Sequence, residues 1–241
     1  MRLPHFQPLP LSRAGAPFSH PDWLFEIKWD GFRSLACIEG SECRLVSRNG
    51  NEFRSFPVLN DAIRNDLQIR SAVLDGEIVC LDGHGKPQFR DLMFRREEPR
   101  LVAFDLLWCD GEDLRYLPLI DRKLRLRSVV PRGGERLLYC DHVDRDGEGL
   151  FRLACEHDLE GIVAKCKSDP YLPEHTRWLK SNHGYSQWVG REELFERERG
   201  SDPDFAVWDG GVLVCEGAEK LGRKRARANP FSLLNRHHVP A

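Results

Sequence analysis

Three charged side chains alternate along the segment FEIKWDGFR, at Glu26, Lys28 and Asp30, and Arg33 follows shortly after them. Alternate residues of a β-strand point to the same face of a sheet, so a strand here would place the three charges together. Gly31 permits a turn that brings Arg33 back toward them. A lysine in this setting is either a nucleophile or a solvated surface charge, and the segment alone leaves both interpretations open.

A second group of acidic residues lies in the segment VLDGE, where Asp75 and Glu77 would share one face of another strand. Two acidic strand faces and a lysine are compatible with a phosphate and metal site, because carboxylates are hard oxygen ligands that Mg²⁺ prefers. Other residues have simpler interpretations when taken singly. Arg48 would ordinarily be a charge at the end of a hairpin, and Phe104 a core residue of an apolar strand.

The elements expected to position these residues follow from periodicity and turn residues. Strands are expected at 23–30, 34–39, 44–47, 72–81, 101–107 and 161–165, and helices around 56–67, 119–129 and 148–157. Meandering strands with inserted helices favour an α+β domain over a regular alternation of strands and helices.

Composition restricts the class of protein. The 241 residues are 41% hydrophobic, and no apolar run is long enough to span a membrane, so we expect a cytoplasmic globular protein. The eight cysteines form no Cys-x-x-Cys pair, which favours reduced core thiols over a zinc site. A net charge of −2 predicts no general attraction to nucleic acid, but the segment KLGRKRAR at 220–227 is a local basic patch. We expect a proline-rich leader at 1–21, a domain at 22–200 and a poorly ordered basic tail at 201–241.

Six short motifs occur in a fixed order along the chain: KWDGFR at 28–33, SRNG at 47–50, LDGEI at 74–78, AFDLL at 103–107, EGIVAK at 160–165 and WLK at 178–180. In order and approximate spacing they resemble the nucleotidyltransferase motifs of ATP-dependent DNA ligases. The resemblance is greatest to the ligase domain of bacterial end-joining ligases and covers residues 22–187. It implies an ATP-grasp-like α+β fold with two antiparallel sheets, flanked by helices, around an ATP cleft.

The resemblance also implies the chemistry. Lys28 would take AMP from ATP, forming a covalent lysine-AMP intermediate, and would pass it to a DNA 5′-phosphate. An amine attacks phosphorus only when neutral, and positive charge from Arg33, Lys180 and a divalent metal would favour the neutral amine while neutralising the triphosphate. Asp30 would orient the lysine. The implied cofactors are ATP and Mg²⁺ or Mn²⁺.

Further residues would bind the nucleotide and the metal. By the resemblance, Glu26 belongs to the nucleotide site, Arg48 and Glu77 hold the ribose, and Phe104 stacks on adenine. The metal ligands would be Glu160 and Glu77. Strand parity places Lys165 on the face opposite Glu160, so we do not expect it in the site.

Two departures from the family pattern affect the expected activity. The last motif usually has lysines at alternate positions, but here Lys180 is followed by Asn182. The sequence after 187 lacks the strand pattern of the OB-fold that normally follows, so we expect an adenylation domain alone, with reduced activity. Expected partners are DNA with nicks or ends, and either end-joining proteins or a separate OB-fold protein; we expect a monomer and no membrane. The alternatives are an RNA ligase or capping-type nucleotidyltransferase, and a non-catalytic accessory that binds nucleotide or DNA ends.

Overall fold

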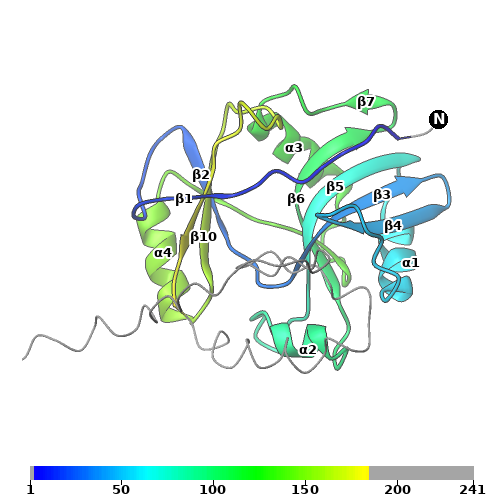
Figure 1. Ribbon diagram of the computed structural model, residues 1–241, viewed down its shortest axis with the longest axis horizontal. Coiled ribbons are helices and arrows are strands. Elements are labelled where there is room, and N and C mark those ends of the chain that lie inside the picture. The colour runs from blue at the N-terminus through cyan, green and yellow to red at the C-terminus, as the bar shows by residue number, and fades with distance from the viewer. Residues whose placement is uncertain (1–2, 185–241) are drawn as a thin grey trace, which may run out of the picture. The chain divides into compact units, whose positions relative to one another are not determined.

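The computed structural model describes residues 3–184, and the expected basic tail with its segment 220–227 lies outside them. The helices are α1 (Pro57–Asp66), α2 (Phe89–Met93), α3 (Leu119–Val129) and α4 (Gly147–Glu156) (Figure 1). The strands are β1 (Ser12–Arg13), β2 (Trp23–Ile27), β3 (Phe32–Glu39), β4 (Glu42–Ser47), β5 (Ser71–Val79), β6 (Arg100–Cys109), β7 (Glu112–Asp113), β8 (Leu137–Tyr139), β9 (Val143–Asp144), β10 (Gly161–Cys166) and β11 (Trp178–Asn182).

Two mostly antiparallel sheets with few helices confirm the expected α+β class. Each strand and helix expected from the sequence is present, and the bounds of α3 are those predicted. The sequence did not predict α2 or the strand β11. The short α2 has no repeating apolar period to reveal it, and β11 is defined mainly by pairing with the distant strand β10.

The five-stranded sheet has the order β1-β11-β10-β2-β9 and presents two different faces. One face packs on α4, where Phe25, Ile162 and Ala164 form a core cluster with Ala154. The register pairs Val163 with Glu26 on β2 and with Lys180 on β11, so these three residues share the other face. That face carries the charged side chains of the site.

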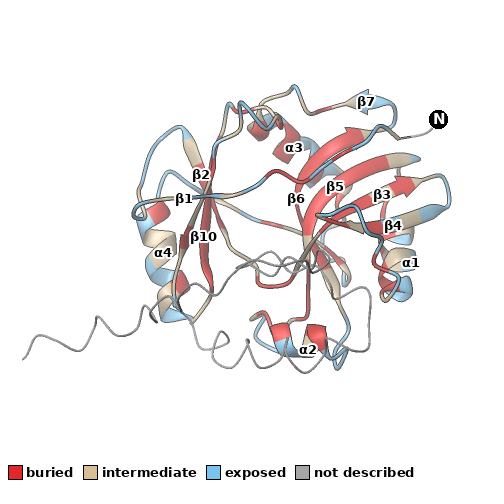
Figure 2. Cartoon of the chain, in the orientation of Figure 1, coloured by how far each residue is buried: buried red, intermediate tan, exposed pale blue. Residues whose placement is uncertain are grey.

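The six-stranded sheet contains β4-β3-β5-β6-β7, with β8 beside β6. On one side it packs on α1 and α3, through Leu59, Ile63 and Leu126. On its other side, Val73 and Val102 belong to a second core cluster, which also contains Leu24 and Trp178 of the five-stranded sheet. Figure 2 shows how buried residues concentrate in β5, β6 and β10. The second cluster therefore joins the two sheets.

The proline-rich N-terminal segment packs on both sheets. Phe6 and Leu9 are buried in the cluster that joins the sheets, and Phe6 meets Trp108 edge to face. Farther along, β1 pairs in parallel with β11, and in Figure 1 the dark blue segment runs across from one sheet to the other. The described part of the segment that we expected to be a leader therefore packs against the domain. Its leucine and phenylalanine side chains supply the apolar surface that is buried there.

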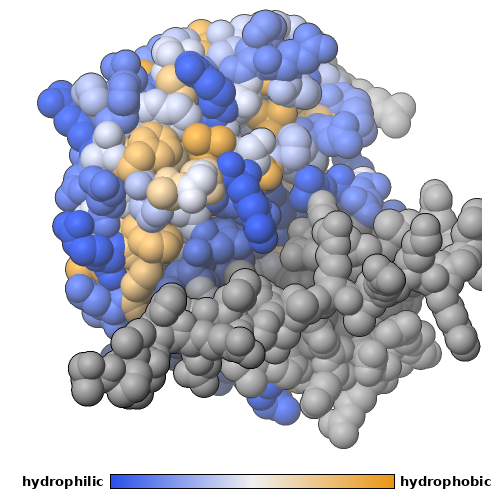
Figure 3. All heavy atoms as spheres, turned by 60° about the vertical axis from the view of Figure 1, so that its left-hand side comes forward, coloured by the Kyte–Doolittle hydropathy of each residue, from blue (hydrophilic) through white to orange (hydrophobic). Residues whose placement is uncertain are grey.

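Helix length, surface hydropathy and the state of the cysteines complete the description of the fold. No helix among the described residues is long and apolar enough to cross a membrane. Figure 3, which brings the α4 side forward, shows mainly hydrophilic side chains with small hydrophobic patches. The seven cysteines within residues 3–184 are free thiols, of which Cys80, Cys140 and Cys166 are buried.

Candidate active site

Lys28 and Glu160 meet where β2 ends and β10 begins. The backbone N–H of Lys28, just after β2, donates to the carbonyl of Gly161 at 2.9 Å. Its Nζ forms an ion pair with Oε1 of Glu160, whose side chain is only 9% exposed. The fold therefore brings the lysine of the first motif into direct contact with the glutamate of the fifth, which is far away in the sequence.

Glu77 lies at the centre of the remaining charged residues. It is the cross-strand partner of Arg33, on β5 and β3. Burial raises the pKa of Glu77 to about 8; the positive charges of Lys28 and Arg33 act against this rise, while the negative charges of Glu160 and Asp30 add to it. The structure thus gathers four other predicted site residues around the carboxyl group of Glu77.

Arg33 is held by contacts within the protein. Its Nε and Nη2 donate to the two carboxylate oxygens of Asp75 at 3.0 and 2.7 Å, and Nη1 donates to the carbonyl of Leu9 at 2.9 Å. The guanidinium also lies 5.2 Å from the ring centre of Phe104 and 5.4 Å from that of Trp178. Arg33 therefore lies in the site beside the predicted adenine residue, with a donor on each of its nitrogens already engaged.

Phe104 occupies a bulge in β6. Asp75 pairs with Asp105 and Gly76 with Ala103, which leaves Phe104 without a partner on β5. A bulge redirects a side chain relative to the regular alternation of a strand. The Phe104 ring is 9% exposed and meets Trp178 edge to face at 6.0 Å. Its predicted stacking on adenine remains a proposal.

Glu26 is the centre of a buried cluster of charges. Its two oxygens accept from Lys123 of α3 at 2.6 Å and pair with Lys165 of β10 at 2.5 Å. Lys165 Nζ also lies 4.3 Å from the ring centre of Phe104 and 4.1 Å from that of Trp178. Burial lowers the pKa of Lys165 in this cluster, which lies next to the predicted nucleotide residues.

The structure places Lys165 beside Glu26, contrary to the strand parity that kept it apart from the predicted site residues. Its partner on β2 is Leu24, two residues before Glu26, so Lys165 and Glu26 share a face. Parity failed because Glu160 precedes the strand and Gly161 has a φ of 140°, which breaks the alternation between Glu160 and β10. The glycine inside the motif EGIVAK was the sequence signal for this break.

The other predicted residues lie at the edges of this group. Lys180 pairs with Val163 and so shares the charged face of the five-stranded sheet. Arg48 directly follows β4, in the same sheet as Glu77. Asn182, at the position of the family's second lysine, lies opposite Gly161, and its Oδ1 is buried with no hydrogen-bond partner.

A divalent metal would have few protein ligands here. No group of three or more His, Cys, Asp or Glu side chains suited to a metal occurs within residues 3–184. Magnesium commonly binds through one or two carboxylates together with substrate phosphates and water, so Glu160 and Glu77 fit this smaller requirement.

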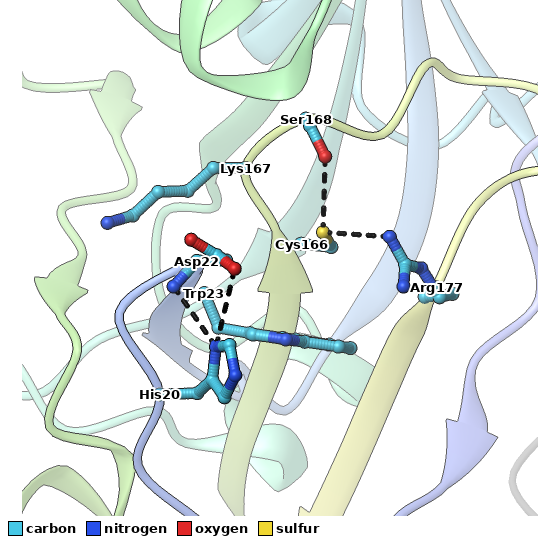
Figure 4. A pocket seen from close by; sticks show the side chains of 7 residues that line it. All are labelled: His20, Asp22, Trp23, Cys166, Lys167, Ser168 and Arg177. Carbon is cyan, nitrogen blue, oxygen red and sulfur yellow. Dashed lines mark hydrogen bonds and ion pairs between the residues drawn. The ribbon is translucent and has the colours of Figure 1, made fainter.

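A separate hollow of about 310 Å³ lies elsewhere on the five-stranded sheet (Figure 4). Seven residues line it, among them Trp23, Cys166 and Arg177. Trp23 begins β2, whereas Lys28 follows its end, and none of the predicted site residues lines the hollow. The charged group around Lys28, and not this hollow, is the candidate active site.

Known proteins share this sequence and fold. Residues 11–181 match the family described as ATP dependent DNA ligase domain. The multifunctional non-homologous end joining protein LigD of Pseudomonas aeruginosa is 34% identical over 66% of this chain and 20% of its own length. The SPbeta prophage-derived DNA ligase-like protein LigB of Bacillus subtilis is 30% identical over 75% of this chain and 68% of its own length.

A solved structure agrees with these sequence matches. The mycobacterial DNA ligase D complexed with ATP and MES superposes with a TM-score of 0.64 and 31% identity, over 73% of this chain and 60% of that one. The chain spans 20 to 31% of the length of the end-joining LigD relatives in Pseudomonas aeruginosa and Bacillus subtilis. This chain belongs to the ATP-dependent DNA ligase domain family, and its described part is an adenylation domain homologous to LigD ligase domains.

Proposed function

We propose that this chain transfers AMP from ATP to DNA through Lys28. The neutral Nζ attacks the α-phosphorus, so that a nitrogen–phosphorus bond forms, the bond to the bridging oxygen breaks, and pyrophosphate leaves. A 5′-phosphate oxygen of DNA then attacks the same phosphorus and releases the lysine. Finally, a 3′-hydroxyl attacks the DNA 5′-phosphorus, expels AMP and seals the strand.

The observation that carries the proposal is the convergence on Lys28. Its amine contacts Glu160 directly, and the charges of Arg33, Glu77 and Asp30 surround the same place. A lysine serving only as a surface charge has no need of partners from three separate strands or strand ends. Phosphoryl transfer depends mainly on positioning and charge neutralisation, which such a group can supply.

The nucleotide would lie between the two sheets, in contact with their charged and aromatic side chains. Phe104 would stack on adenine, with Glu26 at the same end of the site. Arg48 and Glu77 would hold the ribose, and the positive charges of Arg33 and Lys180 would face the phosphates. Support comes from the burial of Phe104 beside Trp178 and from the shared sheet face of Glu26 and Lys180.

Glu160 is the better of the two proposed ligands for Mg²⁺ or Mn²⁺. Glu77, with a pKa of about 8, is mostly protonated at neutral pH in the protein without ligands, and a protonated carboxyl is a poor metal ligand. The same protonated carboxyl can both donate to and accept from a ribose hydroxyl. When bound at Glu160, the metal would supply positive charge for the triphosphate.

We also infer that the first step is slow and that the DNA substrate has nicks or ends. Asn182 provides no positive charge where the family has a second lysine, so one phosphate contact is missing. The LigD relatives are end-joining proteins by name, which favours breaks as substrates and end-joining proteins as partners. We propose that the chain acts as a monomer and that an OB-fold protein is a partner in sealing.

The test is covalent labelling. The 241-residue chain is incubated with α-labelled ATP and Mg²⁺ and separated on a denaturing gel, where a labelled band is expected from ATP and not from GTP. Lys28→Ala should abolish the band. Lys167→Ala is the matched control, because this lysine also pairs with a carboxylate, Asp144, but lies at the far end of β10 from Glu160. An undiminished band in Lys28→Ala would refute the assignment.

Sealing is tested separately. Preadenylated nicked DNA bypasses the first step, and a nick in DNA is compared with one in RNA. We expect slow sealing of ordinary nicks, and faster sealing when an OB-fold protein is added in trans. A chain that binds DNA ends but forms no adduct at any ATP concentration would instead be a non-catalytic accessory.

A further inference from the structure

A closed ring of hydrogen bonds passes through Tyr171. Its hydroxyl donates to Oδ2 of Asp75 at 2.6 Å and accepts from the backbone N–H of Leu9 at 3.1 Å. Asp75 in turn accepts hydrogen bonds from Nε and Nη2 of Arg33. Nη1 of Arg33 closes the ring by donating to the carbonyl of Leu9 at 2.9 Å. Asp75, Tyr171 and Leu9 are each at most 3% exposed, so water does not compete for these bonds.

The ring connects parts of the molecule that carry different sides of the site. Arg33 and Asp75 belong to β3 and β5 of the six-stranded sheet, whereas Tyr171 lies between β10 and β11 of the five-stranded sheet. The Tyr171 ring also meets Trp178 edge to face at 5.6 Å. A single hydroxyl therefore connects the N-terminal segment and both sheets beside the proposed nucleotide residues.

The hydroxyl acts on Arg33 through Asp75. Burial and the adjacent carboxylate raise the pKa of Tyr171 well above its usual range, so the hydroxyl keeps its proton and remains a donor. Hydrogen bonds from a hydroxyl to a carboxylate are among the stronger ones in proteins, and this one restrains the carboxylate plane. That plane in turn sets where the guanidinium lies over Phe104 and Trp178.

We propose that Tyr171 is a positioning residue for adenylyl transfer, whose hydroxyl orients Asp75 and thereby Arg33 against the nucleotide. The inference rests on the proposed reaction at Lys28. Removing the hydroxyl leaves the Arg33–Asp75 pair present but less restrained, and it deprives the buried Leu9 N–H of its acceptor. Displacements of about 1 Å at a reacting site can cost about a hundredfold in rate.

The experiment compares Tyr171→Phe with Tyr116→Phe, which removes a hydroxyl from a side chain that is 69% exposed. At saturating ATP, the rate of adduct formation should fall about 10- to 100-fold in Tyr171→Phe and remain unchanged in Tyr116→Phe, at a temperature where melting curves show both proteins folded. In labelled protein, the Arg33 Nε–H resonance should shift and exchange faster in Tyr171→Phe only.

A double-mutant cycle with Asp75→Asn separates positioning from general weakening. Because Tyr171 acts through Asp75, adding Tyr171→Phe to Asp75→Asn should cost less than twofold more. If Asp75→Asn does not fold, Arg33→Lys takes its place in the cycle. Fully additive losses, or a folded Tyr171→Phe as active as the wild type, would overturn the role of Tyr171. A wild-type chain that forms no adduct would overturn the proposed reaction and this role together.

Discussion

Replacing Glu77 with glutamine should change how stability depends on pH. Burial raises the pKa of Glu77 to about 8 from 4.5, the reference value for the unfolded chain. Between these values the folded protein holds one proton that the unfolded chain has released. The contribution of Glu77 to the free energy of unfolding is therefore largest below pH 4.5, and it is lost as the pH rises through 8.

The magnitude follows from the size of the shift. One pKa unit corresponds to about 1.4 kcal/mol, so the contribution of Glu77 should fall by about 2 to 3 kcal/mol between pH 6 and pH 9. Glutamine resembles the protonated carboxyl and does not titrate. The variant should match the wild type only below pH 4.5, where Glu77 is protonated in both the folded and the unfolded state. Its advantage over the wild type should grow between pH 6 and pH 9 by about 4 to 10 °C in melting temperature.

Thermal melts from pH 5 to 9, with chelator and without nucleotide, measure this difference directly. Glu42→Gln is the control, because Glu42 is an exposed carboxylate in the same sheet and should give a curve parallel to the wild type. If the curves of Glu77→Gln and wild type are also parallel, Glu77 ionises as it would in water. The argument for its neutral form, and for Glu160 as the better metal ligand, would then fail.

Three further substitutions test other parts of the site. Glu26→Gln leaves two buried lysines without their carboxylate and should lower the free energy of unfolding by about 3 to 5 kcal/mol in a urea titration. Gly161→Ala would place a Cβ 2.0 Å from a backbone oxygen at a φ of 140°, so both the melting temperature and adduct yield should fall. Asn182→Lys adds the missing positive charge and should speed adduct formation about tenfold; no gain at any ATP concentration would remove Asn182 as the cause of slow adenylation.

Local patterns in the sequence were sufficient for most elements of the fold. The alternation around Glu26 and the apolar period of α1 depend on neighbours within a few residues, which periodicity records. Motif order then brought Lys28, Glu77 and Glu160 into one prediction, although no local pattern shows that they meet. The ion pair between Lys28 and Glu160 in the structure is in keeping with that prediction, while their roles remain proposals.

The remaining contacts depend on pairing between distant segments. Glu26 meets Lys123 across 97 residues, and Tyr171 meets Asp75 across 96, so neither contact has a periodic signal. Phe104 lies at a bulge that is defined only by the register of β5 against β6. The position of Lys165 beside Glu26 was missed for a related reason, because strand parity does not continue through a glycine at positive φ.

In the proposed reaction, the ion pair between Lys28 and Glu160 would keep the amine from attacking until its substrate is bound. An amine nitrogen that is paired with a carboxylate must leave that carboxylate before it can approach a phosphorus atom. Attack on ATP therefore requires that Glu160 release the amine, and a residue proposed to bind the metal is well suited to do so, because the same oxygen cannot hold both partners at full strength. Nucleotide and metal together would then both fill the site and free its nucleophile, so that Lys28 becomes reactive only when its substrate is present.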